Sequence, residues 1–188
     1  MDTRTLKKIA RLLNENHISW GLGASSMLFF HGLVDQPRDI DLMIDEEDAQ
    51  IAAQLLKKYA SRVQTDDGKG KYATKYFYEM QIDGQDVDMI GGYRILRGEW
   101  IYDFPKLKGM RLDTVDCDGV KIPLTRIEDW FVAYLIMEDP KKRVPMIEGF
   151  AQEKNGFTYK EQIQNAYDQI VRKAPHEKAL MATLKKWI

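Results

Sequence analysis

The stretch Arg38-Asp39-Ile40-Asp41-Leu42-Met43-Ile44 places two acidic residues inside an apolar run. A run of this composition, which follows a loop ending in Pro37, predicts a buried or half-buried strand over residues 39–44. Side chains of a strand alternate between its faces, so Asp39 and Asp41 point the same way. Like charges side by side on a sheet repel each other, and burial without partners adds several kcal/mol. A multivalent cation offsets both costs, and the pair therefore indicates a metal site.

A glycine-rich turn precedes this pair. Gly21-Leu22-Gly23-Ala24-Ser25-Ser26 follows a strand predicted over residues 18–22 and leads into a short helix, which Ser25 or Ser26 can cap. Backbone N–H groups at a helix start, together with a serine hydroxyl, can hold a phosphate. The turn therefore predicts a phosphate-binding element that serves the same reaction as the acidic pair.

A third acid follows in Val87-Asp88-Met89-Ile90, inside a strand predicted over residues 85–90. Asp86 points to the same face, but it comes just after a turn and is expected to be exposed, so we assign the site to Asp88. Two carboxylates on one strand face, joined by a third from a nearby strand, can hold two Mg²⁺ ions about 3.5–4 Å apart. Such a pair of ions neutralises a triphosphate and stabilises a leaving pyrophosphate.

In this order, Leu22-Gly23-Ala24-Ser25, Asp39-Ile40-Asp41 and Val87-Asp88-Met89 resemble the nucleotidyltransferase superfamily, the polymerase-beta-like fold. Residues 20–44 look most like small bacterial members, which include antibiotic adenylyltransferases and minimal nucleotidyltransferases. The resemblance covers roughly residues 18–91. It implies a metal-dependent nucleotidyltransferase that moves a nucleoside monophosphate, AMP from ATP, onto a hydroxyl.

The resemblance also implies roles for individual residues. Asp39, Asp41 and Asp88 would be the catalytic carboxylates and the ligands of two Mg²⁺ ions. Asp88 would also be the general base for the acceptor hydroxyl. The nucleoside triphosphate would bind at the turn formed by Gly23, Ala24, Ser25 and Ser26.

The chain departs from the family pattern at two positions. Ala24 stands where the family has a second glycine or a serine, so the phosphate contact must come from Ser25, Ser26 or the backbone. Many small members carry an arginine four residues before the first acid, and here that position is Asp35, with Arg38 directly before Asp39 instead. Both departures bear on nucleotide affinity more than on metal binding.

The remaining sequence predicts an α+β fold. A mixed β-sheet flanked by helices is expected over residues 1–122, followed by a C-terminal helical bundle over residues 123–188. In the first part we expect a helix over 3–15, a helix capped by Asp45, a Gly-rich turn over 66–70, a strand over 72–82, and hairpin turns at Asp83-Gly84 and Asp118-Gly119. In the helical part we expect capping boxes over 125–128 and 158–161, and a helix stop at Asn155-Gly156. Residues 93–109 show no pattern that assigns them.

The composition restricts the partners. The 188 residues carry a formal net charge of -1 and are 44% hydrophobic, which is typical of an ordered soluble protein. A near-neutral chain disfavours a long nucleic-acid acceptor and gives no reason to expect a membrane, so we expect a small-molecule or protein hydroxyl as acceptor. Cys117 is the only cysteine, and its acidic neighbours disfavour a thiolate. We expect a cytoplasmic protein, and the oligomeric state stays open, a homodimer included.

Two alternatives stay open at this point. A dinucleotide-binding oxidoreductase would explain Gly21 and Gly23 after a strand, with Asp45 about twenty residues on. Against it, Ser26 replaces the third glycine, and acids are unexpected in a parallel strand that is apolar on both faces. A non-catalytic binding or antitoxin-like module would keep the fold without the reaction.

Overall fold

The computed structural model describes residues 1–65 and 73–188. The predicted turn over residues 66–70 and the first residues of the strand predicted over 72–82 therefore lie outside the described residues. Lys69 and Lys71 also lie outside the described residues.

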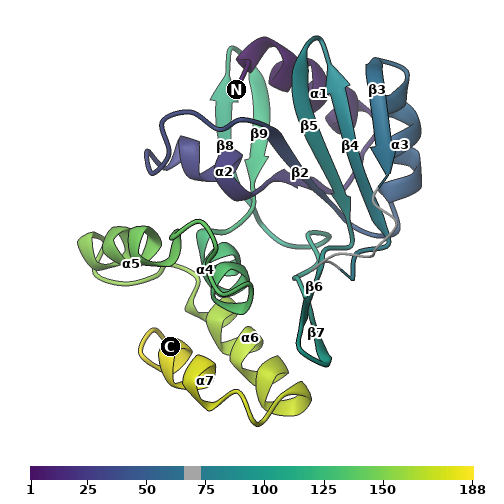
Figure 1. Cartoon of the computed structure of the whole chain (residues 1–188). Coiled ribbons are helices and arrows are strands. Elements are labelled where there is room, and N and C mark those ends of the chain that lie inside the picture. The colour runs from purple at the N-terminus through teal and green to yellow at the C-terminus, as the bar shows by residue number, and fades with distance from the viewer. Residues whose placement is uncertain (66–72) are drawn as a thin grey trace. The chain divides into compact units, whose positions relative to one another are not determined.

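The described chain forms two compact units (Figure 1). Unit 1 comprises Met1–Tyr93 and Pro105–Thr125, and unit 2 comprises Arg94–Phe104 and Arg126–Ile188. The boundary between residues 122 and 123 stays a prediction about the folding domains.

A seven-stranded mixed sheet organises unit 1. Its strand order is β3-β4-β5-β2-β1-β9-β8, with β2 parallel to β5, β1 parallel to β9, and antiparallel pairing elsewhere. The strands are β1 (Trp20–Leu22), β2 (Ile40–Ile44), β3 (Ala60–Thr65), β4 (Tyr76–Ile82), β5 (Gln85–Gly91), β8 (Asp113–Cys117) and β9 (Val120–Leu124). Together with its flanking helices, this mixed sheet confirms the predicted α+β class.

Three helices accompany the sheet, namely α1 (Thr3–Glu15), α2 (Ala24–Phe30) and α3 (Ala49–Lys57). The helix predicted over residues 3–15 is confirmed. Asp2 caps it by accepting a hydrogen bond from the backbone N–H of Arg4 at 3.0 Å. Its apolar face is buried through Leu6, Ile9, Ala10 and Leu13. Within the described residues, no helix combines the length and the apolar character needed to cross a bilayer.

Asp45 does not cap α3, so that prediction was wrong. The chain makes a turn after β2, and Asp48 occupies the N-cap position. The Asp45 carboxylate instead accepts hydrogen bonds from the backbone N–H groups of Leu107 and Lys108, at 2.8 and 2.7 Å. A buried carboxylate needs donors, and distant backbone groups supply them here.

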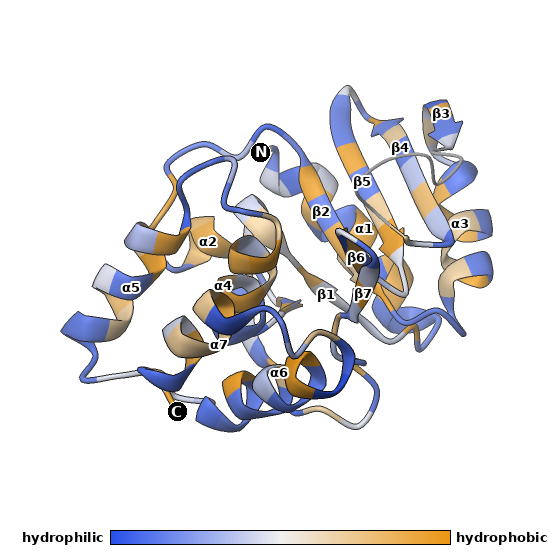
Figure 2. Ribbon diagram, turned by 60° about the horizontal axis from the view of Figure 1, so that its bottom comes forward, coloured by the Kyte–Doolittle hydropathy of each residue, from blue (hydrophilic) through white to orange (hydrophobic). Residues whose placement is uncertain are grey.

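Unit 2 consists of four helices and a hairpin. The helices are α4 (Ile127–Ile136), α5 (Val144–Glu153), α6 (Lys160–Lys173) and α7 (Lys178–Lys185), and the hairpin pairs β6 (Arg94–Arg97) with β7 (Trp100–Asp103). α4 is buried along nearly its whole length, and Figure 2 colours most of it as hydrophobic. The hairpin lies in the stretch that the sequence left unassigned.

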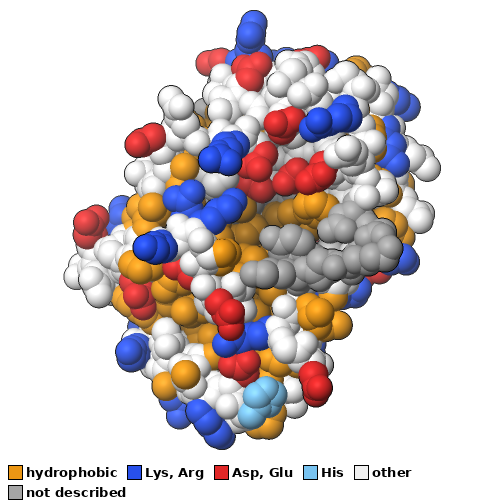
Figure 3. Space-filling view, viewed as in Figure 1, with side chains coloured by type: hydrophobic (Ala, Val, Ile, Leu, Met, Phe, Trp, Pro, Cys, Tyr) orange, Lys and Arg blue, Asp and Glu red, His pale blue; other side chains and the backbone are white. Residues whose placement is uncertain are grey.

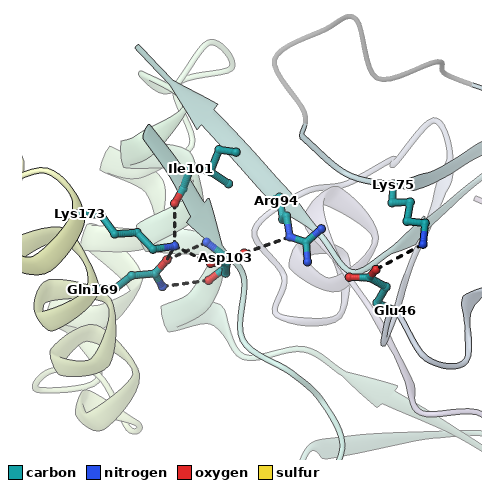
Figure 4. Close-up of polar contacts among 7 residues, drawn as sticks. All are labelled: Glu46, Lys75, Arg94, Ile101, Asp103, Gln169 and Lys173. Carbon is teal, nitrogen blue, oxygen red and sulfur yellow. Dashed lines mark hydrogen bonds and ion pairs between the residues drawn. The ribbon is translucent and has the colours of Figure 1, made fainter. Parts of the chain in front are cut away.

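Charged side chains attach the hairpin to the helices of unit 2. Arg97 forms a two-pronged ion pair with Glu177, at 2.7 and 3.1 Å. Asp103 accepts from Arg94 and from Lys173 of α6, as Figure 4 shows. Burial raises the pKa of Asp103, but the two cations outweigh it and hold the pKa below its usual value.

The two predicted capping boxes are wrong, although helices follow both. The Thr125 hydroxyl donates to the carbonyl of Leu22 at 2.7 Å, and Arg126 occupies the N-cap position of α4. Glu128 accepts from the backbone N–H groups of Thr158 and Tyr159, at 2.9 and 3.0 Å. Thr125 and Glu128 thus form hydrogen bonds with backbone groups far away in the sequence, and not with the first turn of α4 as a capping box requires. The helix stop at Asn155-Gly156 is confirmed, since both residues have positive φ directly after α5.

Candidate active site

Three carboxylates come together on the sheet of unit 1. Asp39, Asp41 and Asp88 each offer one oxygen, and these oxygens all lie within 4.8 Å of one another. Asp41 on β2 and Asp88 on β5 are direct partners in the parallel register of the two strands. Because direct partners project from the same face of a sheet, the register brings the two side chains together. We call the three residues the acidic triad.

The apolar residues of β2 explain why the triad lies where it does. β2 runs between β5 and β1, and all five of its residues are buried. Ile40 and Leu42 face away from the triad and are 0% exposed. A slip of the strand by one residue would move these apolar side chains to the other face, so their burial fixes the register. Asp41 is itself only 8% exposed.

The glycine-rich turn lies against this part of β2. The backbone N–H of Gly23 donates to the carbonyl of Asp41 at 2.9 Å, and the Ser25 hydroxyl donates to the Asp41 carboxylate at 3.3 Å. Gly23, and neither of the two serines expected there, occupies the N-cap position of α2. Ser26 is fully buried, and its hydroxyl contacts the backbone of β2.

Ala24 adopts a conformation that favours glycine. Its φ is +42°, in the left-handed region where a Cβ atom is disfavoured. Ala24 is one of the two positions at which the chain departs from the pattern of the superfamily that it resembles. The surrounding turn therefore holds the backbone in this conformation against the steric preference of alanine.

Asp86 and Asp88 have different surroundings. Asp86 pairs with Gln81 across β4 and β5, accepts from its amide at 3.3 Å, and lies 3.6 Å from the guanidinium of Arg62. Asp88 instead lies in the triad. The structure therefore brings Asp88 together with Asp39 and Asp41 and leaves Asp86 outside that cluster.

The sequence interpretation missed Glu79, which is the direct cross-strand partner of Asp88 on β4. The sequence did contain the information that places Glu79 opposite Asp88. A two-residue turn at Asp83-Gly84 pairs Ile82 with Gln85, and counting three residues back along β4 and three forward along β5 gives this pair. Figure 3 shows acidic side chains gathered on the viewed face of unit 1, over the strands of this part of the sheet. Another acid near these strands, Glu46, lies 3.9 Å from Lys75 (Figure 4).

The triad offers ligands that suit a hard divalent cation. Carboxylate oxygens are preferred by Mg²⁺, Mn²⁺ and Ca²⁺. Three carboxylates within 4.8 Å of one another repel, and a divalent cation among them would offset that repulsion. The residues present therefore fit the metal that the family resemblance implies.

Two expectations about chemistry other than nucleotidyl transfer can be compared with the structure. Burial, followed by the charges of Asp118 and Asp116, raises the pKa of the Cys117 thiol, which confirms it as a poor nucleophile. A dinucleotide-binding oxidoreductase is not favoured, because β1 pairs antiparallel with β2 where that fold has parallel strands joined by helices.

Comparisons with known proteins agree with this fold. No protein-family model matches the chain, and no curated protein matches it by sequence. Among solved structures, the chain is similar to a protein from Thermotoga maritima that is described as a "putative nucleotidyltransferase". The TM-score is 0.61 and the identity 28%, over 81% of this chain and 92% of that one.

The chain is also similar to the antibiotic-resistance factor ANT(2'')-Ia. Its solution structure gives a TM-score of 0.55 at 14% identity, over 99% of this chain and 94% of that one. Its crystal structure with adenylyl-2''-tobramycin gives 0.51 at 13% identity, over 98% of each chain. These two likenesses show the fold alone. Taken together, the matches confirm the resemblance to the nucleotidyltransferase superfamily and support nucleotidyltransferase as the general class.

Proposed function

We propose that this protein is a Mg²⁺-dependent nucleotidyltransferase that moves AMP from ATP onto a hydroxyl of a small molecule or a protein. One observation carries the proposal, namely that Asp39 directly before β2, Asp41 on β2 and Asp88 on β5 lie together and border the glycine-rich turn. The spacing in the sequence made this arrangement an expectation, and the strand register supplies the geometry.

Each residue of the triad has a proposed role. Asp39 and Asp41 would ligate two Mg²⁺ ions, and Asp88 would contribute a third carboxylate and accept the proton of the acceptor hydroxyl. When bound, the metal would neutralise the triphosphate and stabilise the charge that develops on the leaving group. The acceptor oxygen forms a bond to the α-phosphorus, the bond from that phosphorus to the bridging oxygen breaks, and pyrophosphate leaves.

The glycine-rich turn is the proposed binding element for the triphosphate. The N–H of Gly23 already donates to the carbonyl of Asp41, so Gly23 would shape the turn. The phosphate contacts would then come from the backbone of Ala24 and from Ser25, which is half-buried and lies beside the triad. A hydroxyl and backbone N–H groups are suited to phosphate oxygens.

A small-molecule acceptor agrees with what is known of one structural neighbour. ANT(2'')-Ia has been crystallised with adenylyl-2''-tobramycin, an adenylylated small molecule. The near-neutral charge of this chain, -1, also disfavours a long polyanionic acceptor. These two observations support a small-molecule acceptor, and a protein hydroxyl remains the other acceptor of the proposal.

The test compares nucleotide binding and transfer in matched variants. Wild type, Asp39→Asn/Asp41→Asn and the control Asp86→Asn are titrated with ATP, CTP, GTP and UTP, with Mg²⁺ or with EDTA. The labelled nucleotides are then incubated with a panel of hydroxyl acceptors. We expect Mg²⁺-dependent binding of ATP and labelled product in wild type and in Asp86→Asn, and neither in the double variant. Wild type that binds no nucleotide in a metal-dependent way would overturn the proposal, and binding without transfer to any acceptor would favour the non-catalytic module.

A further inference from the structure

The hydroxyl of Ser26 lies between two backbone groups of the acidic strand. It donates to the carbonyl of Asp39 at 2.8 Å and accepts from the N–H of Asp41 at 3.1 Å. Ser26 is 0% exposed. A hydroxyl has one proton and two lone pairs, so these two bonds use its only donor. Its oxygen also lies 3.4 Å from the Asp41 carboxylate.

The Ser26 hydroxyl lies beside β2 just beyond the point where the pairing of β1 with β2 ends. β1 pairs with β2 from Trp20 opposite Ile44 to Leu22 opposite Leu42, and then the chain turns into α2. The N–H of Gly23 reaches the carbonyl of Asp41, which is the last backbone bond from that side. The Ser26 hydroxyl continues the ladder by one more step, because it bonds to the carbonyl of Asp39 and to the N–H of Asp41.

We propose that Ser26 is a positioning residue that fixes Asp39 and Asp41 for metal binding. The inference rests on the proposed function. β5 holds β2 on one side through the pairing of Asp41 with Asp88, and Ser26 holds it on the other side. Because the Ser26 contacts are to the backbone on either side of Ile40, they fix the spacing of the two carboxylates. Outer partners of this kind typically contribute roughly 10- to 100-fold to metal affinity.

This role differs from the phosphate contact that the sequence suggested for Ser26. A side chain that is 0% exposed, with its only proton donated to Asp39, is poorly placed to meet a phosphate. Ser25, the half-buried residue next to it, suits that contact better. In this proposal Ser25 contacts the nucleotide, and Ser26 positions the carboxylates of Asp39 and Asp41.

The experiment measures Mn²⁺ affinity by electron paramagnetic resonance, and folding in EDTA by circular dichroism and urea titration. The variants are Ser26→Ala, which removes the hydroxyl, and Ser26→Thr, which keeps it. Ser26→Cys keeps the shape of the side chain, with a larger atom that is only a weak donor, and it replaces the alanine variant if that variant does not fold. Ser61→Ala is the matched control, because Ser61 also donates to a backbone carbonyl, that of Gln81, but on the exposed strand β3.

We expect Ser26→Ala to fold in EDTA and to bind Mn²⁺ roughly 10- to 100-fold more weakly than wild type. Ser26→Thr should bind more tightly than Ser26→Ala, and Ser61→Ala should match wild type. Mn²⁺ binding by Ser26→Ala within about twofold of wild type overturns the inference, as does a folded threonine variant that binds no better than alanine. Wild type that binds no Mn²⁺ overturns the proposed function itself, so the two failures are distinguishable.

Discussion

Two groups of acids in this protein are accommodated in different ways. In unit 1 the acidic triad gathers three carboxylates from β2, from the residue before it and from β5, with one oxygen of each within 4.8 Å of the others. In unit 2 two acids lie side by side at the start of the apolar helix α4, where Glu128 and Asp129 are each 1% exposed. Both arrangements oppose the preference of carboxylates for water. The comparison shows what each group uses to offset that cost.

In unit 2, Glu128 is stabilised by backbone N–H donors and Asp129 by protonation. One oxygen of Glu128 accepts from two N–H groups ahead of α6. Burial, and next the charge of Glu128, raises the pKa of Asp129 to about 8. The amide of Gln162, in the orientation that satisfies its neighbours, donates to Asp129 at 3.2 Å. Asp129 is therefore largely protonated at neutral pH, whereas we propose that the triad offsets its repulsion with a metal cation.

The largest expected effect is on the triad. Asp39→Asn/Asp41→Asn should lower the transfer rate by on the order of a thousandfold, about 4 kcal/mol, because two metal ligands lose their charge. The same change should leave the free energy of unfolding in EDTA unchanged or higher, since it removes like-charge repulsion. Kinetic assays and urea titrations would measure both quantities. A large loss of stability in EDTA would contradict the comparison, because the carboxylates would then be serving the fold.

Asp129→Asn should give the next largest effect, and its sign depends on pH. The folded pKa of about 8 lies above the ordinary value of 3.8, so between these values the folded state keeps a proton that the unfolded state releases. Stability of wild type therefore falls as pH rises from about 4 to 8 and is constant above that range. The asparagine variant lacks this dependence and should gain up to about 3 kcal/mol over wild type between pH 5 and pH 8. Urea titrations at the two pH values would measure the gain, and an equal difference at both would show that Asp129 is ionised.

Added metal should stabilise wild type by a smaller amount. Mg²⁺ or Mn²⁺ at ten times its dissociation constant should raise the free energy of unfolding by about 1.4 kcal/mol, because only the folded triad binds it. Asp129→Asn should show the same gain, while Asp39→Asn/Asp41→Asn should show none. Thermal melts with metal and with EDTA would record these differences. An equal gain in the triad variant would mean that the cation binds elsewhere.

Ala24→Gly should have the smallest effect. Relief of the positive φ favours the variant, while the greater freedom of glycine in the unfolded chain opposes it, which leaves a gain of about 0.5 kcal/mol. Ala182→Gly is the matched control, because Ala182 is exposed in the middle of α7 and its replacement should destabilise by about 0.5–1 kcal/mol. Urea titration of both variants would show opposite signs. Destabilisation by Ala24→Gly would indicate that contacts of the Ala24 methyl group matter more than strain.

Local patterns predicted much of unit 1. The apolar period of α1, the apolar run of β2 and the Asp83-Gly84 turn each reflect short-range physics that the sequence displays. The site acids followed from the same strand assignments. Contacts between residues that are distant in the sequence were harder to predict. No residue near Asp45 in the sequence indicates that its carboxylate accepts hydrogen bonds from Leu107 and Lys108.

The hairpin of unit 2 could not be foreseen for a related reason. β6 and β7 have four residues each, too short for a clear alternating pattern, and much of their stabilisation comes from helices far along the chain. Arg97 meets Glu177, and Asp103 meets Lys173. The contacts of Ser26 could not be predicted from the sequence either. They depend on the residue at which β1 ends, and no sequence motif indicates that residue.

The chain order of the two units has a consequence for dissecting the protein. Because unit 1 resumes at Pro105 after the hairpin and ends at Thr125, the backbone passes from one unit to the other three times. A protease cut at any one of these passages yields two fragments, and at least one of them contains residues of both units. Cutting the gene after residue 125 would likewise leave the hairpin behind without Glu177 and Lys173. Unit 2 is thus interleaved in the chain with the unit that carries the acidic triad, and no single cut of the chain separates the two units.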